Sequence, residues 1–150
     1  MSPELETLLA EQACRDLVLA AADAVDRRDF LALADLFEPR GVLVRPDGSE
    51  LLGREAIVSA YAARDPDRLT RHLVSNQRVR VDRPAGTAVA SCSVLLWSGR
   101  QSDAHSLRGR PADPVEQVGE IRDLLVRTAE GWRIRRREAW FTLVREGGRA

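Results

Sequence analysis

Lysine is absent from this chain of 150 residues, so all 23 basic side chains are arginines. The absence excludes Schiff-base chemistry on a lysine and a phosphate-binding loop built around one. Histidine and tyrosine are scarce too, with only His72, His105 and Tyr61. No cysteine and histidine spacing is typical of a zinc site, and no glycine-rich phosphate cradle occurs. We therefore expect neither a metal nor a cofactor.

An excess of charge is also missing, because 23 acidic residues balance the 23 arginines. Nucleic-acid-binding proteins depend on surplus cations, so we expect no nucleic-acid partner. No apolar run approaches the length of a membrane span, and the N-terminal region lacks the basic segment of a signal peptide. Cys14 and Cys92 lie within apolar patterns. These features favour a reduced, cytoplasmic protein with no membrane association.

The chain has the length and composition of one globular domain over residues 1–150, with 44% hydrophobic and 31% charged residues. Apolar residues that recur every three or four positions predict helices at 3–25, 30–37 and 55–63. Pro39 and Gly41 are expected to end the second helix. Alternating apolar residues predict strands at 41–45, 70–82, 87–98, 115–128 and 132–144, with a polar loop at 99–114.

Helices at the front of the chain and hairpins at the back predict an α+β domain. We expect a cone, in which a curved, mostly antiparallel sheet wraps around three N-terminal helices and leaves a small-molecule pocket at its open end. The strands at 87–98 and 115–128 carry apolar side chains on both faces, although only one face can cover the helices. The outer face of the sheet therefore predicts a homodimer.

Four segments together resemble the SnoaL-like branch of the nuclear transport factor 2-like superfamily. They are DRRDF at 26–30, GREAI at 53–57, TRHLVSN at 70–76, and a stretch from 119 to 137 that contains GEIRD and GWRI. The resemblance covers roughly residues 5–143 and implies the cone fold. The superfamily includes scytalone dehydratase, ketosteroid isomerase, polyketide cyclases, epoxide hydrolases and the β subunits of aromatic-ring-hydroxylating dioxygenases.

The similarity to scytalone dehydratase implies a catalytic role for His72 and a buried, orienting role for Asp26. A carboxylate that accepts the Nδ1–H of a histidine fixes its tautomer and leaves Nε2 free as a base. The alternative is a purely structural hydrogen bond between helix and sheet. This chain has Val25, Gly99 and Ile121 at or near the positions where that enzyme has a tyrosine, a second histidine and an asparagine. Dehydration of the same substrate is therefore not expected.

Asn76, Trp97 and Tyr61 are the candidates for substrate contact. Asn76 lies four residues after His72, on the same strand face if no bulge intervenes, where it could hold a carbonyl or hydroxyl group. The alternative for Asn76 is a hydrogen bond to a neighbouring loop or helix end. The resemblance places Trp97 on the pocket side, where it could stack on a cyclic ligand. The alternative for Trp97 is packing in the core or in a dimer.

The arginines at 133, 135, 136 and 137 resemble a basic patch. Antiparallel pairing can set them against acidic residues of the neighbouring strand, so we expect a solvated sheet face rather than a binding site. His105, in the polar loop, is expected to be a surface residue.

Two functions remain open. The first is a cofactor-free lyase, isomerase or cyclase that acts on a hydrophobic cyclic or polyketide-like molecule, with His72 as general acid–base. The second is a non-catalytic binding or assembly module. Similarity of RHLVSN and of the final hairpin to dioxygenase β subunits, the structural partners of an iron-bearing α chain, supports the second function.

Overall fold

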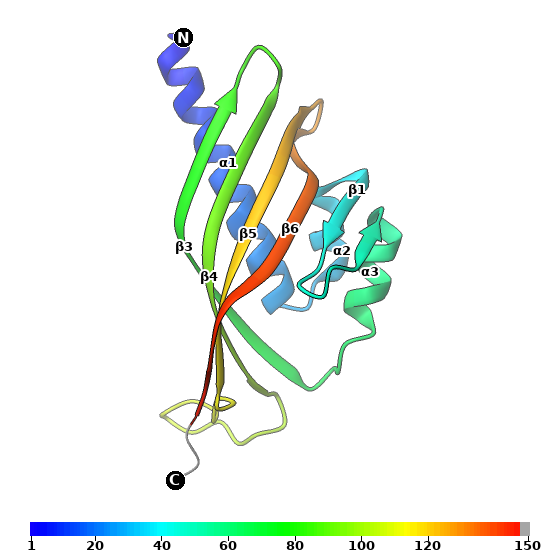
Figure 1. The fold of residues 1–150 in the computed structure, drawn as a ribbon, viewed down its shortest axis with the longest axis vertical. Coiled ribbons are helices and arrows are strands. Elements are labelled where there is room, and N and C mark those ends of the chain that lie inside the picture. The colour runs from blue at the N-terminus through cyan, green and yellow to red at the C-terminus, as the bar shows by residue number, and fades with distance from the viewer. Residues whose placement is uncertain (148–150) are drawn as a thin grey trace.

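The computed structural model describes residues 1–147, which form helices followed by a long curved sheet, with a small hairpin between the second and third helices (Figure 1). The helices are α1 (Pro3–Asp26), α2 (Phe30–Asp35) and α3 (Arg54–Ala62). The strands are β1 (Phe37–Val44), β2 (Glu50–Leu52), β3 (Arg68–Asp82), β4 (Thr87–Arg100), β5 (Val115–Thr128) and β6 (Gly131–Glu146).

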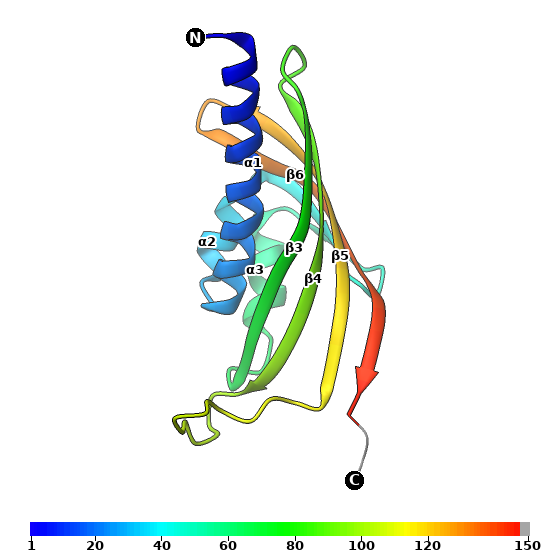
Figure 2. The same ribbon diagram turned by 90° about the vertical axis from the view of Figure 1, so that its left-hand side faces the viewer.

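The six strands form one mixed sheet in the order β2-β1-β6-β5-β4-β3. Every neighbouring pair is antiparallel except β1 and β6, which are parallel. Figure 2 shows α1 along the concave face, while the far ends of the strands curve beyond the helices. The predicted α+β cone is thus confirmed, with one parallel pair added to it.

The first helix begins and packs as its sequence predicts. The Ser2 hydroxyl accepts a hydrogen bond from the Leu5 backbone N–H at 3.2 Å, and Pro3 occupies the first turn, where its missing N–H costs nothing. The buried residues along α1 are Ala10, Cys14, Leu17, Val18, Ala21 and Ala24. Their small side chains let the helix approach the sheet closely. Within residues 1–147, no helix is long and apolar enough to cross a membrane.

The second helix is shorter than predicted. Asp29 caps it, since its side chain accepts a hydrogen bond from the Ala32 backbone N–H at 3.1 Å. The helix ends at Asp35, and Phe37 already belongs to β1 rather than to the helix. Phe37 is fully buried and pairs with Ile134 of β6. The strand therefore starts where its first side chain enters the core, four residues before the predicted start.

Bulges in the long strands change which side chains face the helices. The register of β3 against β4 shifts between Ser75 and Arg78, and the register of β6 against β5 shifts around Arg135 and again around Thr142. An extra residue in one strand reverses the faces of all residues beyond it. These shifts decide which polar residues reach the interior.

Gly41 lies at the irregular part of β1, where the backbones of β1 and β6 come close together. A Cβ atom at this position would lie 2.9 Å from Phe37 Cβ and 3.0 Å from the carbonyl oxygens of Glu38 and Ile134. Two of these three neighbours are backbone atoms, which cannot move aside cheaply. We expect Gly41→Ala to lower the free energy of unfolding by about 1–3 kcal/mol, measured by urea denaturation. Exposed Arg40→Ala should change it by less than about 0.5 kcal/mol, and equal effects would contradict the prediction.

Candidate active site

The carboxylate of Asp26, the last residue of α1, connects that helix to β3. Its Oδ1 lies 2.5 Å from His72 Nδ1 and accepts a hydrogen bond from the Thr70 hydroxyl at 2.9 Å. Its Oδ2 accepts the backbone N–H of His72, also at 2.9 Å. An ionised carboxylate only accepts hydrogen bonds, so His72 carries its proton on Nδ1. The predicted contact is present, and Nε2 of His72 is the nitrogen left free.

The same hydrogen bonds control the charge of Asp26. Burial alone would raise the pKa of the carboxyl group, because it disfavours the charged form. Hydrogen bonds from the His72 ring, the His72 backbone and the Thr70 hydroxyl outweigh burial and lower the pKa below its usual value. Asp26 is therefore a carboxylate at neutral pH, and its charge can stabilise a protonated His72.

His72 lies on the wall of a cavity of about 580 Å³ between the C-terminal half of α1 and the concave face of the sheet. Most of this wall is apolar. Its apolar members are Val18, Ala21, Ala22, Val25, Leu43, Pro46, Val74, Val94, Leu96, Gly119, Ile121, Ala139, Trp140 and Phe141. A volume of this size holds a small cyclic molecule, and the apolar wall strengthens electrostatic interactions at the histidine.

Tyr61, at the end of α3, lines the same cavity as His72. Its ring packs against Phe30, with 5.5 Å between ring centroids, and the guanidinium carbon of Arg64 lies 4.1 Å above the ring centre. The sequence-predicted residues Asp26, His72 and Tyr61 are therefore gathered at one place by three different elements.

Asn76 and Trp97 lie elsewhere. The β3 bulge starts directly after Ser75, and Asn76 adopts a φ of 52° with its side chain exposed, outside the cavity lining. The assumption of an unbulged strand therefore does not hold. Trp97 is 48% exposed and pairs with Arg71 on the outer face of the sheet, because Leu96 is the residue that faces the cavity. The prediction that Trp97 lies on the pocket side of the sheet is therefore wrong. His105 is exposed, as predicted.

Sequence reasoning predicted that Arg137 pairs with an acidic residue of the neighbouring strand, but it missed that Arg137 lines the cavity and is only 7% exposed. Its Nε and Nη2 donate hydrogen bonds to the two carboxylate oxygens of Asp123 at 2.7 and 2.8 Å. The bulge at Arg135 turns Arg137 inward, so the predicted solvated face is wrong at this position. A signal existed in β5, where Asp123 alternates with Ile121 and Leu125 on the buried face.

Neither a metal cluster nor a reactive thiol accompanies these residues. Over residues 1–147, no three histidine, cysteine or carboxylate side chains come together as a metal site would require. Burial raises the pKa of the Cys92 thiol to about 11, which keeps it protonated at neutral pH.

Three solved structures illustrate what the fold is similar to. A type 2 hexachlorocyclohexane dehydrochlorinase (LinA) matches with a TM-score of 0.80 at 15% identity, over 98% of this chain and 95% of that protein. A provisionally named scytalone dehydratase from Novosphingobium aromaticivorans DSM 12444 matches with 0.77 at 20%, over 97% and 93%. A provisionally named aromatic ring hydroxylase from Novosphingobium aromaticivorans matches with 0.76 at 23%, over 93% and 94%.

At these identities the structural likeness establishes the fold and leaves the reaction open. No curated protein matches the sequence. The sequence pattern of the SnoaL-like domain, however, matches residues 6–138, which is most of the chain. With the cone of helices and curved sheet already in evidence, this match shows that the chain belongs to the SnoaL-like domain family and has the fold of nuclear transport factor 2-like proteins.

Proposed function

We propose that this protein is a cofactor-free lyase, isomerase or cyclase that uses His72 as its general base on a hydrophobic cyclic or polyketide-like molecule. One observation carries the proposal. The His72 ring is hydrogen-bonded through Nδ1 to the Asp26 carboxylate, which is 12% exposed, while it lines a mostly apolar cavity of about 580 Å³. A histidine held in this way has one tautomer and one basic nitrogen.

The proposed chemistry starts with proton transfer from a carbon next to an electron-withdrawing group to Nε2 of His72. Asp26 stabilises the imidazolium that results. In a lyase, the released electron pair forms a carbon–carbon double bond as the leaving group departs, and His72 returns its proton to that group. In an isomerase, His72 returns the proton to a different carbon of the delocalised anion. In a cyclase, the electron pair forms a bond to a carbonyl carbon, the C=O π electrons move to the oxygen, and His72 gives its proton to that oxygen.

Arg137 supplies a further element of this proposal. Its guanidinium is fixed by two hydrogen bonds to Asp123 and borders the cavity. A preorganised donor of this kind stabilises an oxygen that gains negative charge when the proton leaves. The names of two structural neighbours, a dehydrochlorinase and a provisionally named dehydratase, are those of elimination enzymes and support the lyase form.

Loss of the basic nitrogen should abolish proton abstraction. We expect His72→Gln to slow deuterium uptake at the acidic carbon of mono-, bi- and tricyclic ketones in D2O by about 10²–10⁴-fold, measured by NMR. Asp26→Asn should slow it by about 10²-fold or more, because the amide selects the wrong tautomer. The melting temperature of each variant is recorded alongside.

The second histidine provides the matched control. His105→Gln removes an exposed imidazole that does not line the cavity and should leave the exchange rate unchanged. If wild type and His72→Gln exchange at the same rate while His72→Gln loses roughly 1–3 kcal/mol of stability, the pair is structural. The non-catalytic binding or assembly module would then be the better description.

The lowered pKa of Asp26 predicts a specific dependence of stability on pH. A carboxyl group whose pKa falls on folding stabilises the protein above its unfolded value of ~3.9, and this contribution is lost as pH falls through the lower folded value. The stability deficit of Asp26→Asn should therefore be full at pH 6 and should shrink steadily below about pH 4. Urea denaturation across this range measures it. A deficit that stays constant from pH 6 down to pH 3 would contradict the prediction.

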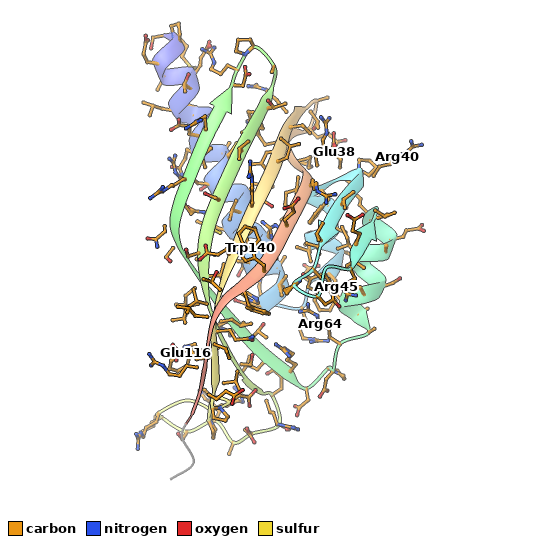
Figure 3. All side chains as sticks on the ribbon, viewed as in Figure 1. Glu38, Arg40, Arg45, Arg64, Glu116 and Trp140 are labelled. Carbon is orange, nitrogen blue, oxygen red and sulfur yellow. The ribbon has the colours of Figure 1, made fainter. Side chains whose placement is uncertain are left out.

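The second part of the proposal concerns assembly as a homodimer through the outer face of the sheet. The register places Leu73, Leu95, Val118 and Leu143 directly opposite one another, in one row across four strands. Leu143 is 64% exposed and Trp140, seen on this face in Figure 3, is 43% exposed. An apolar row of this kind suits an interface of about 1,000 Å² or more.

A charge placed in that row should separate the two copies. We expect light scattering to give twice the 16.7 kDa of one chain for the wild type and a single chain for Leu143→Glu. Leu31→Glu, at a side chain on α2 that is 71% exposed, should remain dimeric. A monomeric wild type at micromolar concentration would refute the proposal.

A further inference from the structure

Arginines converge at one end of the cavity, where the turn after β1 meets the segment that follows α3. Arg45, Arg64 and Arg68 all line the cavity, although they come from different parts of the chain. Figure 3 shows Arg45 and Arg64 in the same region, beside the β1–β2 hairpin and the end of α3. Like charges that converge repel one another, and an anion placed between them relieves the repulsion.

These three arginines have no carboxylate partner. Within residues 1–147, no carboxylate oxygen lies within 4.0 Å of their guanidinium nitrogens. The hydrogen bonds that orient two of them go to neutral acceptors. Arg45 Nε donates to the Ser49 hydroxyl at 2.9 Å, and Arg68 Nη2 donates to the Ser98 hydroxyl at 3.4 Å. The Ser49 hydroxyl donates in turn to Asp47 Oδ1 at 2.6 Å, so this carboxylate partly offsets the charge of Arg45 without contacting it.

Arg64 is the central member of the group. Its guanidinium carbon lies 4.1 Å above the Tyr61 ring, a stacking that leaves the in-plane N–H donors available. Burial is the main cause that lowers the pKa of Arg64, while the charges of Arg68, Arg45 and Arg28 act in the same direction. An anion bound to these N–H groups would offset both effects.

The acidic residues near this end indicate how much negative charge it accepts. Asp47 and Asp65 line the same end, so the three cavity-lining arginines face two carboxylates. Arg28, whose Nη1 donates to the Asp65 carbonyl oxygen at 3.2 Å, adds a further positive charge beside Arg64. Glu120 also lines the cavity, but from β5, where it accepts a hydrogen bond from the Ser93 hydroxyl at 2.9 Å. Because the rest of the wall is mostly apolar, an anion that carries an apolar ring, such as a cyclic carboxylate, suits the cavity better than a free phosphate.

We propose that Arg45, Arg64 and Arg68 form a subsite for a carboxylate, and that the ligand of this protein is a cyclic organic acid whose apolar ring extends toward His72. The proposal rests on the proposed function, because it names the substrate class of the same cavity. The buried pair of Arg137 and Asp123 is neutral as a unit, so the excess of arginine charge lies at the end formed by Arg45, Arg64 and Arg68.

Binding of two probes with the same ring tests the proposal. Isothermal titration calorimetry should show 2-naphthoate bound roughly tenfold or more tightly than neutral 2-naphthamide. Arg64→Gln and Arg45→Gln should each reduce this ratio severalfold, with the fold verified by circular dichroism. Arg64→Lys should keep part of the ratio, because it retains the charge but loses the planar fork. Added salt should lower the ratio of the two affinities for the wild-type protein as well.

The control variant is Arg40→Gln, at an exposed β1 side chain that Figure 3 shows pointing outward, and it should leave the ratio unchanged. Equal affinity for the two probes, no binding of 2-naphthoate at millimolar concentration, or a ratio that survives both Gln variants would overturn the carboxylate subsite. Tighter binding of inorganic phosphate than of 2-naphthoate would overturn it as well. If His72→Gln still prefers 2-naphthoate over 2-naphthamide, the subsite is supported even where no proton exchange is detected. The carboxylate subsite and the catalytic role of His72 can therefore be refuted independently.

Discussion

The Asp26 carboxylate is the junction on which the site depends. A buried charge is costly unless hydrogen bonds replace its hydration, and here the His72 ring, the His72 backbone and the Thr70 hydroxyl all supply them. The three donors belong to one strand and the acceptor to the end of α1. Satisfying the carboxylate therefore fixes the height of the helix over the sheet, the start of β3 and the orientation of the imidazole at once. The cavity is the space left between α1 and the strands at the separation that these hydrogen bonds fix.

The elements of the fold could be predicted from the sequence because their apolar periodicities are regular. Which face of the sheet each side chain occupies could not be predicted, because a bulge adds one residue to a strand without a local signal in the sequence. Asn76 is turned out of the cavity by such a bulge, and Arg137 is turned into it by another. The Asp26–His72 pair was predicted from the resemblance to scytalone dehydratase, and the prediction held because the β3 bulge comes only after Ser75. Both errors therefore share one physical origin, the two-residue period of a strand.

Trp97 illustrates a different limit. Both faces of β4 are moderately apolar, so alternation alone does not say which face turns inward. Packing decides it, because α1 approaches the sheet through small residues such as Ala21 and Ala24. The face of β4 that carries Ala88, Ala90 and Cys92 can accept a helix at this distance, whereas the face with Trp97 cannot. Side-chain volume summed along a strand thus carries information that hydrophobicity alone does not.

The ion pair of Arg137 and Asp123 places an oriented dipole in the cavity wall. Two parallel hydrogen bonds hold the guanidinium in one plane, and the opposite charge beside it cancels its long-range field. What remains is an oriented dipole, whose influence decays much faster with distance than that of a free charge. Such a group cannot draw ions in from solution. It acts on an oxygen only once that oxygen is in contact, so it distinguishes one orientation of a bound ring from another after capture is complete.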